Sequence, residues 1–402
     1  MVDVPSNRLE KYKNLHRENA GEGMINLHPI QRGGILTEAA RKALVEWGDG
    51  YSTCDWCPPK TARLDMIHDP PISEFLEDVA MFLGMDIARV VTRCREAKFI
   101  AFSSLAKPGD YIVIDSLAHY TTYLAAEAAG LKIKEVPHNG YPEYRINPNA
   151  YAEKIEEVRK ETGKAPAFTF LTHVDYLFGN VNDVAPVSMI SHDAGIPFIL
   201  NGAYTAGIMP LDGRALGADV LVGSGHKSWA ASAPTGILAM TKEIAEKTLG
   251  RSKIVGDISK RKFGQKELML LGCTVMGAPM LTLMASFPEV VERTKHYDEE
   301  VKKARWLVSE LERIEGTRQI GIRPKDHTLM HVETPAFFKV SQAHKREGFF
   351  LYDELKSRKI VGIQAGLSKH FKVNTYGLTW DQIKFVAASF QDIAKKYGIP
   401  TN

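Results

Sequence analysis

The chain has 402 residues, with 51 Lys or Arg against 48 Asp or Glu, so its formal net charge at neutral pH is +3. A chain of this length can bury a large core and is expected to form two domains. The small net charge is no independent sign of a nucleic-acid partner. No run approaches the roughly 18 apolar residues that span a bilayer. Four cysteines are too few for a disulfide framework, and no secretion signal is recognisable, which favours a reduced, cytoplasmic setting.

From about residue 72, helical and strand-like segments alternate along the chain. Helices are predicted at 72–85, after a proline pair, and at 149–163 and 185–195. Short apolar runs that are typical of buried strands occupy 110–115, 165–173, 196–201 and 218–224. This alternation predicts an α/β domain with a mostly parallel sheet. In such a sheet the ligand lies beyond the carboxyl ends of the strands.

The pattern changes after Pro279. A long helical stretch is predicted from about 281 to 315, and it leads into a mixed segment at 327–340 and a final amphipathic helix at 380–398. These segments predict a smaller C-terminal α/β domain, connected by the long helix. The predicted division is an N-terminal segment over 1–60, a large domain over 61–285 and a small domain over 286–402.

The segment ADVLVGSGHKSWAASAP, residues 218–234, carries the strongest chemical signal. A predicted strand leads into Lys227, and small residues on both sides allow a ligand to approach closely. A lysine after a strand is usually a solvated surface residue. A lysine held at the carboxyl edge of a parallel sheet, however, suits a Schiff base with an aldehyde cofactor.

Three further residues fit the same ligand. Arg95 opens a helix in TRCREAKF, where free N–H groups and the guanidinium can hold a phosphate. His119 follows one strand, where an imidazole can stack on a flat ring, and Asn201 ends another. Taken singly, they read as a surface charge, a capping or core histidine, and a turn residue. Together they are typical of a pyridoxal phosphate enzyme of the aspartate aminotransferase type.

More specific motifs accompany these residues: NLHPIQRGG, REAKF, AHYTT, NGAY, GSGHKS and LGCTVMGAP, with an early Cys-x-x-Cys. In this combination the chain resembles the archaeal O-phosphoseryl-tRNA:cysteinyl-tRNA synthase family over nearly its whole length. The resemblance implies a fold type I pyridoxal phosphate enzyme, a transferase of tRNA-dependent cysteine biosynthesis. Such an enzyme eliminates phosphate from phosphoserine attached to tRNA(Cys) and adds sulfur in its place.

The resemblance also implies roles for individual residues. Lys227 carries the cofactor and acts as general base, His119 stacks on the cofactor ring, and Asn201 faces the pyridine nitrogen. The residues expected around the cofactor phosphate are Cys94, Arg95, Ser224, Gly225 and His226. The family usually has a small residue at the position of Cys94, so we interpret this thiol as a packing element. The residues that hold the substrate phosphate stay open, with Arg32, His173, Lys369 and Tyr376 as candidates.

The remaining cysteines are candidates for sulfur chemistry. Cys54 and Cys57 form a Cys-x-x-Cys, which by itself fits half a zinc site, a dithiol pair or coincidence. The absence of a second such motif argues against structural zinc. With Cys273 they make three thiols, one short of the usual four for an iron–sulfur cluster. They either ligate a cluster with an open position or carry and reduce a persulfide, and both chemistries stay open.

The resemblance implies partners as well: tRNA(Cys) charged with O-phosphoserine, a second copy of the chain in a homodimer, and the phosphoseryl-tRNA synthetase. The segment 242–266 is rich in Lys and Arg and is a candidate tRNA contact, although a solvated loop explains it equally well. Two alternative functions remain. One is a cysteine desulfurase-like or lyase-like enzyme of free amino acids, and the other is a non-catalytic iron–sulfur or tRNA-assembly protein.

Overall fold

The computed structural model describes residues 8, 10–13, 23–49, 52–53, 70–272 and 275–402. The three cysteines predicted for sulfur chemistry, Cys54, Cys57 and Cys273, lie outside the described residues. Among the residues that are described, no helix has the length and apolar character that crossing a membrane requires.

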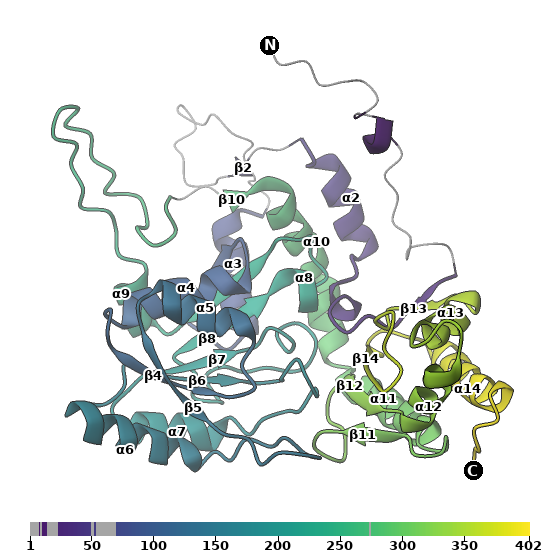
Figure 1. Cartoon of the computed structure of the whole chain (residues 1–402). Coiled ribbons are helices and arrows are strands. Elements are labelled where there is room, and N and C mark those ends of the chain that lie inside the picture. Colours follow the sequence, from purple (N-terminus) through teal and green to yellow (C-terminus); the bar gives the residue numbers. More distant parts are fainter. Residues whose placement is uncertain (1–7, 9, 14–22, 50–51, 54–69, 273–274) are drawn as a thin grey trace.

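A seven-stranded sheet forms the centre of the larger part of the molecule (Figure 1). Its strands, in their order across the sheet, are β3 (Ile87–Val91), β9 (Gly236–Met240), β8 (Val220–Ser224), β7 (Phe198–Asn201), β6 (Thr169–Thr172), β4 (Tyr111–Asp115) and β5 (Lys132–Val136). Only β9 runs antiparallel to its neighbours in this sheet. The prediction of an α/β fold with a mostly parallel sheet is confirmed.

Helices cover both faces of this sheet, because successive strand residues point to opposite faces. Val113 points into one core, together with residues of α3, α6 and α7. Its neighbours Ile112 and Ile114 point into the other core, together with residues of α4, α5 and α9. The helices around the sheet are α3 (Ile72–Phe82), α4 (Cys94–Leu105), α5 (Tyr120–Ala128), α6 (Ala150–Thr162), α7 (Ala185–Asp193), α8 (Gly225–Ser228) and α9 (Lys242–Thr248).

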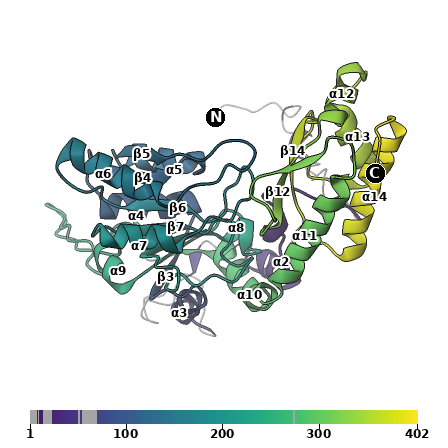
Figure 2. The same cartoon turned by 90° about the horizontal axis from the view of Figure 1, so that it is seen from below.

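A second, smaller α/β layer lies beside the large sheet, and we call its residues, 297–402, the small lobe (Figure 2). Its antiparallel sheet has the order β11 (Arg318–Ile320), β12 (Leu329–Glu333) and β14 (His370–Asn374). Its helices are α11 (Tyr297–Leu311), α12 (Pro335–Ala343), α13 (Phe349–Ser357) and α14 (Trp380–Lys396). A capping box of Thr379 and Gln382 begins α14, which supplies much of the apolar core.

The predicted long helix over 281–315 is two helices, α10 (Gly277–Thr294) and α11. The break falls at Lys295 and His296, whereas Pro288 lies inside α10. A break without Gly or Pro has no local sequence signal, so the prediction of one continuous helix was wrong.

The N-terminal elements pack against both parts of the molecule. Strand β1 (Ile25–Asn26) pairs with β13 (Ile360–Val361) of the small lobe, and Ile25 and Leu27 join the small-lobe core. Helix α2 (Glu38–Glu46) lies beside α10. The remaining short elements are η1 (Glu10–Tyr12), η2 (Arg32–Gly34), and the antiparallel pair β2 (Ser52–Thr53) and β10 (Val275–Met276). The domain boundaries at 60 and 285 remain predictions.

Candidate active site

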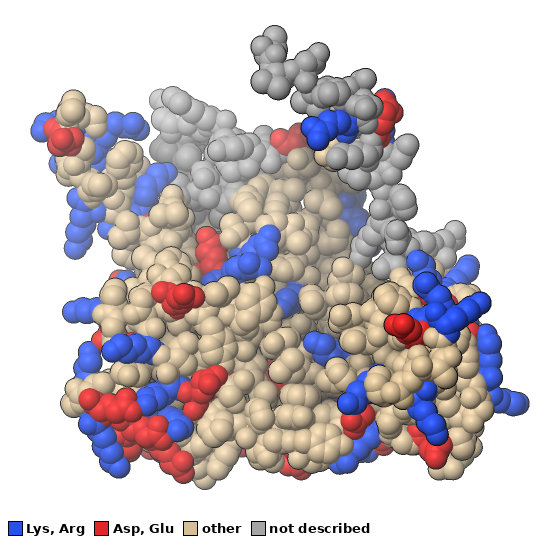
Figure 3. Space-filling view, viewed as in Figure 1, with Lys and Arg blue, Asp and Glu red and all other residues tan. Residues whose placement is uncertain are grey.

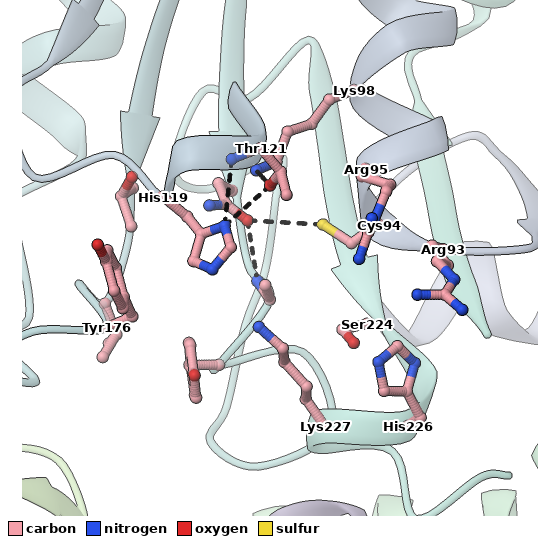
Figure 4. Close-up of a pocket in the computed structure, with 15 residues that line it drawn as sticks. Arg93, Cys94, Arg95, Lys98, His119, Thr121, Tyr176, Ser224, His226 and Lys227 are labelled. Atoms are coloured by element: carbon pink, nitrogen blue, oxygen red, sulfur yellow. Dashed lines mark hydrogen bonds between the residues drawn. The ribbon is translucent and has the colours of Figure 1, made fainter. Parts of the chain in front are cut away.

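A cleft opens at the carboxyl ends of the parallel strands (Figure 4). Three of its lining residues end strands: Thr172 ends β6, Asn201 ends β7 and Ser224 ends β8. The other lining residues are Arg93, Cys94, Arg95, Lys98, His119, Thr121, Val174, Tyr176, Ala203, Tyr204, His226 and Lys227. Four of the described lining residues are lysine or arginine, and none is a carboxylate. The cleft is therefore suited to anionic ligands.

Lys227 lies in the short helix α8, directly after β8, and its amine points into the cleft. Its Nζ is 4.7 Å from the centroid of the Tyr204 ring. Burial lowers the pKa of Lys227, and the nearby charges of Arg95 and Lys372 act in the same direction, against the opposing influence of Cys94. A lowered pKa increases the fraction of neutral amine, which is the form that attacks a carbonyl or accepts a proton.

One side of the cleft is built to hold a phosphate group. Arg93, Arg95, Ser224 and His226 lie together on this side in Figure 4. Within the described part of the chain, the buried Ser224 Oγ has no hydrogen-bond partner. Helix α4 also begins here, at Cys94, without a side-chain cap at its N-terminus. An unpaired hydroxyl, two guanidinium groups and a helix N-terminus form a donor set that fits the phosphate of pyridoxal phosphate.

His119 lies across the cleft from this phosphate side and is held by a chain of polar contacts. Its Nδ1 is 3.0 Å from Thr121 Oγ1 and accepts the Thr121 N–H at 3.3 Å. The Nζ of buried Lys98 donates to Thr121 Oγ1 at 3.0 Å, so the Thr121 hydroxyl proton is free to point at His119. Burial lowers the pKa of His119 to about 3, helped by Lys227 and Lys98. The ring is therefore neutral and keeps its proton on Nε2.

Asn201 is oriented by two donors. Its Oδ1 accepts the N–H of Ala203 at 3.2 Å and lies 3.8 Å from the Sγ of Cys94. Because the oxygen is occupied in this way, the Nδ2 group remains to face the cleft. Burial raises the pKa of Cys94, so this residue is a neutral thiol in contact with Asn201.

The structure brings most of the predicted site residues together around one cleft. Those that line it are Cys94, Arg95, His119, Asn201, Ser224, His226 and Lys227. Gly225 does not line it, and its N–H donates to Thr235 O. The candidates for the substrate phosphate do not line it either: Arg32, His173, Lys369 and Tyr376. Arg32 instead donates to Tyr376 O, and His173 is buried beside Thr205.

Several residues that line the cleft were not predicted from the sequence. Lys98 is fully buried, although a helical lysine normally indicates a solvated position. Its only signal was its place in the REAKF motif, three residues after Arg95. Tyr176 lies three residues after His173, and Tyr204 ends the NGAY motif, but neither tyrosine was singled out.

The sheet, the lysine after β8 and the anion-holding side opposite His119 define a pyridoxal phosphate enzyme of fold type I. Solved structures support this class through fold alone. A cysteine desulfurase from Thermococcus onnurineus has a TM-score of 0.73 at 17% identity, covering 93% of this chain and 95% of that one. A ureidoglycine–glyoxylate aminotransferase from Bacillus subtilis has a TM-score of 0.71 at 14% identity, covering 96% of each chain.

Closer similarities identify the family. The model of the family O-phosphoseryl-tRNA(Sec) selenium transferase, SepSecS, matches residues 72–395. An O-phospho-L-seryl-tRNA:Cys-tRNA synthase 2 from Archaeoglobus fulgidus is 54% identical over 94% of this chain and 96% of its own length. An O-phospho-L-seryl-tRNA:Cys-tRNA synthase from Methanopyrus kandleri is 50% identical, covering 97% of this chain and 99% of its own length.

A solved SepCysS, in complex with the SepCysE N-terminal domain, has a TM-score of 0.89 at 48% identity and covers 98% of this chain and all of its own. The chain belongs to this family of O-phosphoseryl-tRNA-dependent enzymes.

Proposed function

We propose that this chain converts O-phosphoseryl-tRNA(Cys) to cysteinyl-tRNA(Cys) with pyridoxal phosphate as cofactor. The observation that carries the proposal is the composition of the cleft around Lys227. Its described lining residues include four lysines and arginines and no carboxylate, and the neutral Asn201 is among them. Relatives that are about half identical over nearly their whole length are named for this reaction, which supports the substrate assignment.

The two sides of the cleft would bind different parts of the cofactor. Arg93, Arg95 and Ser224 would hold the cofactor phosphate, with the N-terminus of α4. His119 would stack on the ring from the opposite side. When bound, pyridoxal phosphate takes up the electron pair that is left when a substrate loses its α-proton.

Lys227 would move the proton of this reaction. When pyridoxal phosphate is bound, Lys227 would hold it through its amine, and in the presence of substrate this amine would accept the α-proton. Burial lowers the pKa of Lys227, which increases the fraction of the freed amine that is neutral and can accept a proton. After sulfur has been added, the same group returns the proton to the α-carbon.

Asn201 would limit how strongly the cofactor withdraws electrons. Its Nδ2 would donate a hydrogen bond to the pyridine nitrogen but could not hold a proton there by charge, as a carboxylate does. A weaker electron sink is sufficient when phosphate, a good leaving group, departs from the β-carbon. It also disfavours transamination, which would end the reaction with the wrong product.

Sulfur would arrive through Cys54, Cys57 and Cys273. Either one thiol carries a persulfide whose terminal sulfur adds to the β-carbon, and a second thiol attacks the resulting mixed disulfide, which releases the product thiol and leaves an enzyme disulfide for an external thiol to reduce. Or the three ligate an iron–sulfur cluster that releases sulfur. Cys94 is a different kind of thiol, because burial raises its pKa and it faces Asn201.

The partners proposed for this enzyme are tRNA(Cys), a second subunit and proteins of the same pathway. Residues 250–272 project from the body, and Lys and Arg side chains gather on this projection in Figure 3. A bidentate ion pair of Arg89 with Glu267, whose shorter contact is 2.7 Å, anchors the C-terminal part of this projection. This basic projection supports a tRNA partner. The solved relative bound to SepCysE supports a protein partner, and a complex with the phosphoseryl-tRNA synthetase belongs to the same proposal.

Phosphate release from two substrates tests the proposal against its main alternative. The holoenzyme, with a sulfide or persulfide donor, is given either phosphoseryl-tRNA(Cys) or free O-phosphoserine at equal concentration. We expect rapid phosphate release only from the tRNA-linked substrate. Equal or faster release from free O-phosphoserine would instead indicate a lyase of free amino acids.

A further inference from the structure

One face of the small lobe continues the cleft. Side chains alternate along β12 and β14, and the buried apolar set is Met330, Val332, Phe371 and Val373. The other set, which we call the ribbon face, is His331, Glu333, His370 and Lys372. His331 is paired with Lys372 and Glu333 with His370, so these four side chains lie on one face of the small sheet. In Figure 2, β12 and β14 form the side of the small lobe that is turned toward the large sheet.

The ribbon face meets the cleft at Tyr176. Lys372 Nζ donates to the carbonyl oxygen of Tyr176 at 3.1 Å and lies 5.1 Å from the centroid of its ring. The Tyr176 ring is in turn 4.8 Å from the His119 ring, and both line the cleft. Figure 4 shows His119 and Tyr176 on the side away from Ser224 and His226. The ribbon face therefore begins where the cleft is farthest from the cofactor phosphate.

Flat rings accompany Lys372 on the ribbon face. The rings of His331 and His370 are 5.1 Å apart, and His331 stacks on Phe178 at 5.4 Å with an angle of 17° between the planes. Burial lowers the pKa of His331 to about 4, so this imidazole is neutral. His370 is exposed, and so is Tyr141, whose hydroxyl donates to Glu333. The rings of His370 and Tyr141 are therefore exposed to solvent, and the guanidinium of Arg318 lies over the Tyr141 ring.

Among the described residues, two cations lie at the ribbon face: Lys372, and Arg318 of β11, which is the cross-strand partner of Glu333. Glu333 accepts the hydroxyl of Tyr141 at 3.0 Å, and the ring of Tyr141 has the guanidinium carbon of Arg318 5.5 Å from its centroid. Asp175 is buried and accepts backbone N–H groups of its own loop, so it is not presented to solvent. A positive group between aromatic rings is the combination that binds single-stranded nucleic acid.

We propose that the ribbon face and Tyr176 dock the single-stranded 3′ end of the charged RNA. The inference rests on the proposed function, in which the amino acid is an ester of the terminal ribose. The last nucleotides must then lie against the surface that adjoins the cleft. Lys372 contacts a backbone phosphate, and His370 and Tyr141 stack on unpaired bases. A free amino acid has no base to place on these rings.

Binding of a single-stranded probe tests the docking surface. The full-length holoenzyme is titrated with a fluorescent RNA oligonucleotide that ends in the CCA of a tRNA. Removing a stacking ring or a phosphate contact is expected to weaken binding roughly tenfold in His370→Ala and in Lys372→Ala. The logarithm of the association constant for the probe falls linearly with the logarithm of the salt concentration. Lys372→Ala is expected to make this slope shallower by about 0.7, and His370→Ala is expected to leave the slope unchanged.

Two variants control for general effects of the substitutions. Lys356 also lies over a tyrosine ring, at 5.6 Å from Tyr352, but in α13 away from the cleft, so Lys356→Ala should bind the probe normally. Lys372→Arg keeps the charge and should keep the wild-type salt slope. Probe binding unchanged in both His370→Ala and Lys372→Ala would overturn the inference, as would an equal loss in Lys356→Ala.

Two further outcomes separate the docking surface from the proposed function. If Lys372→Ala weakens the binding of free O-phosphoserine more than the binding of the RNA probe, Lys372 binds the amino acid and the inference is wrong. If the wild-type enzyme does not process phosphoseryl-tRNA, the proposed function falls and the inference falls with it. If the wild type processes it and only probe binding is unaffected by the variants, the docking surface alone is wrong.

Discussion

At the residue scale, the neutral amide of Asn201 is the feature that most constrains the reaction. Asn201→Asp is expected to place a carboxylate against the pyridine nitrogen, to hold a proton there and to strengthen the electron sink. The amino form of the cofactor, a product of transamination, should then accumulate during turnover. Absorbance spectra recorded over successive turnovers measure it. An Asn201→Asp enzyme with no more of the amino form than the wild type would contradict this role of the amide.

The four cysteines are expected to differ in their effect on sulfur transfer. Cys54→Ala, Cys57→Ala and Cys273→Ala should each strongly depress sulfur transfer while the visible absorbance of the bound cofactor stays intact. Cys94→Ala is the matched control and should be close to silent, because its thiol makes only a weak contact of 3.8 Å with Asn201. Cysteine formation on tRNA is the measurement. A damaging Cys94→Ala together with a silent Cys57→Ala would show that the thiols are wrongly assigned.

Single residues were predictable where a motif ended a strand. Lys227, Asn201 and His119 were predicted in this way and do line the cleft, because a strand pattern followed by a polar residue indicates the ligand-binding edge of a parallel sheet. Lys98 was not found, since a lysine in an amphipathic helix has the same sequence signature whether it is solvated or buried. Its burial depends on the hydroxyls of Thr121 and Thr122, which are contributed by another helix.

At the scale of elements, the start of α4 depends on a glycine in β9. A Cβ at Gly236 would lie 2.3 Å from the carbonyl carbon of Arg93 and 2.5 Å from the nitrogen of Cys94. Gly236→Ala should therefore push the N-terminus of α4 away from the cleft and weaken cofactor binding, with a packing cost of about 1–3 kcal/mol. Equilibrium titration with pyridoxal phosphate measures the loss.

Gly264→Ala provides the control for this substitution. In the projecting segment, a Cβ at Gly264 would have no neighbour closer than 4.0 Å, so its cofactor affinity should be that of the wild type. If Gly236→Ala also binds the cofactor normally, the start of α4 does not form the phosphate site.

The elements themselves were predictable to different degrees. The strands β4, β6, β7 and β8 stood out as apolar runs with clear ends, because buried parallel strands are apolar on both faces. The pairing of β1 with β13 could not be predicted, since two-residue strands have no periodicity and their partners are far apart in the chain. The break between α10 and α11 could not be predicted, because neither Lys295 nor His296 is a helix-breaking residue.

At the scale of the whole molecule, the predicted sulfur chemistry depends on two subunits. We predict a homodimer in which Cys54 and Cys57 serve the cleft of the other subunit. A mixed dimer of one Lys227→Ala subunit and one Cys54→Ala subunit would then contain one intact site. About half of the wild-type rate per dimer is expected if the two sites act independently. Verified heterodimers without activity would indicate that the cysteines act within their own subunit.

Lys227 is expected to perform cofactor chemistry on an amino acid that is attached to tRNA. The most direct test is mass spectrometry of the 3′-terminal aminoacyl-adenosine, released from phosphoseryl-tRNA(Cys) after incubation with the holoenzyme and a sulfur donor. Cysteinyl-adenosine is expected with the wild type, at a rate that Lys227→Ala lowers roughly 10²- to 10⁴-fold or more. Phosphoseryl-adenosine left unchanged by the wild type, or cysteinyl-adenosine formed equally well by Lys227→Ala, would contradict the account.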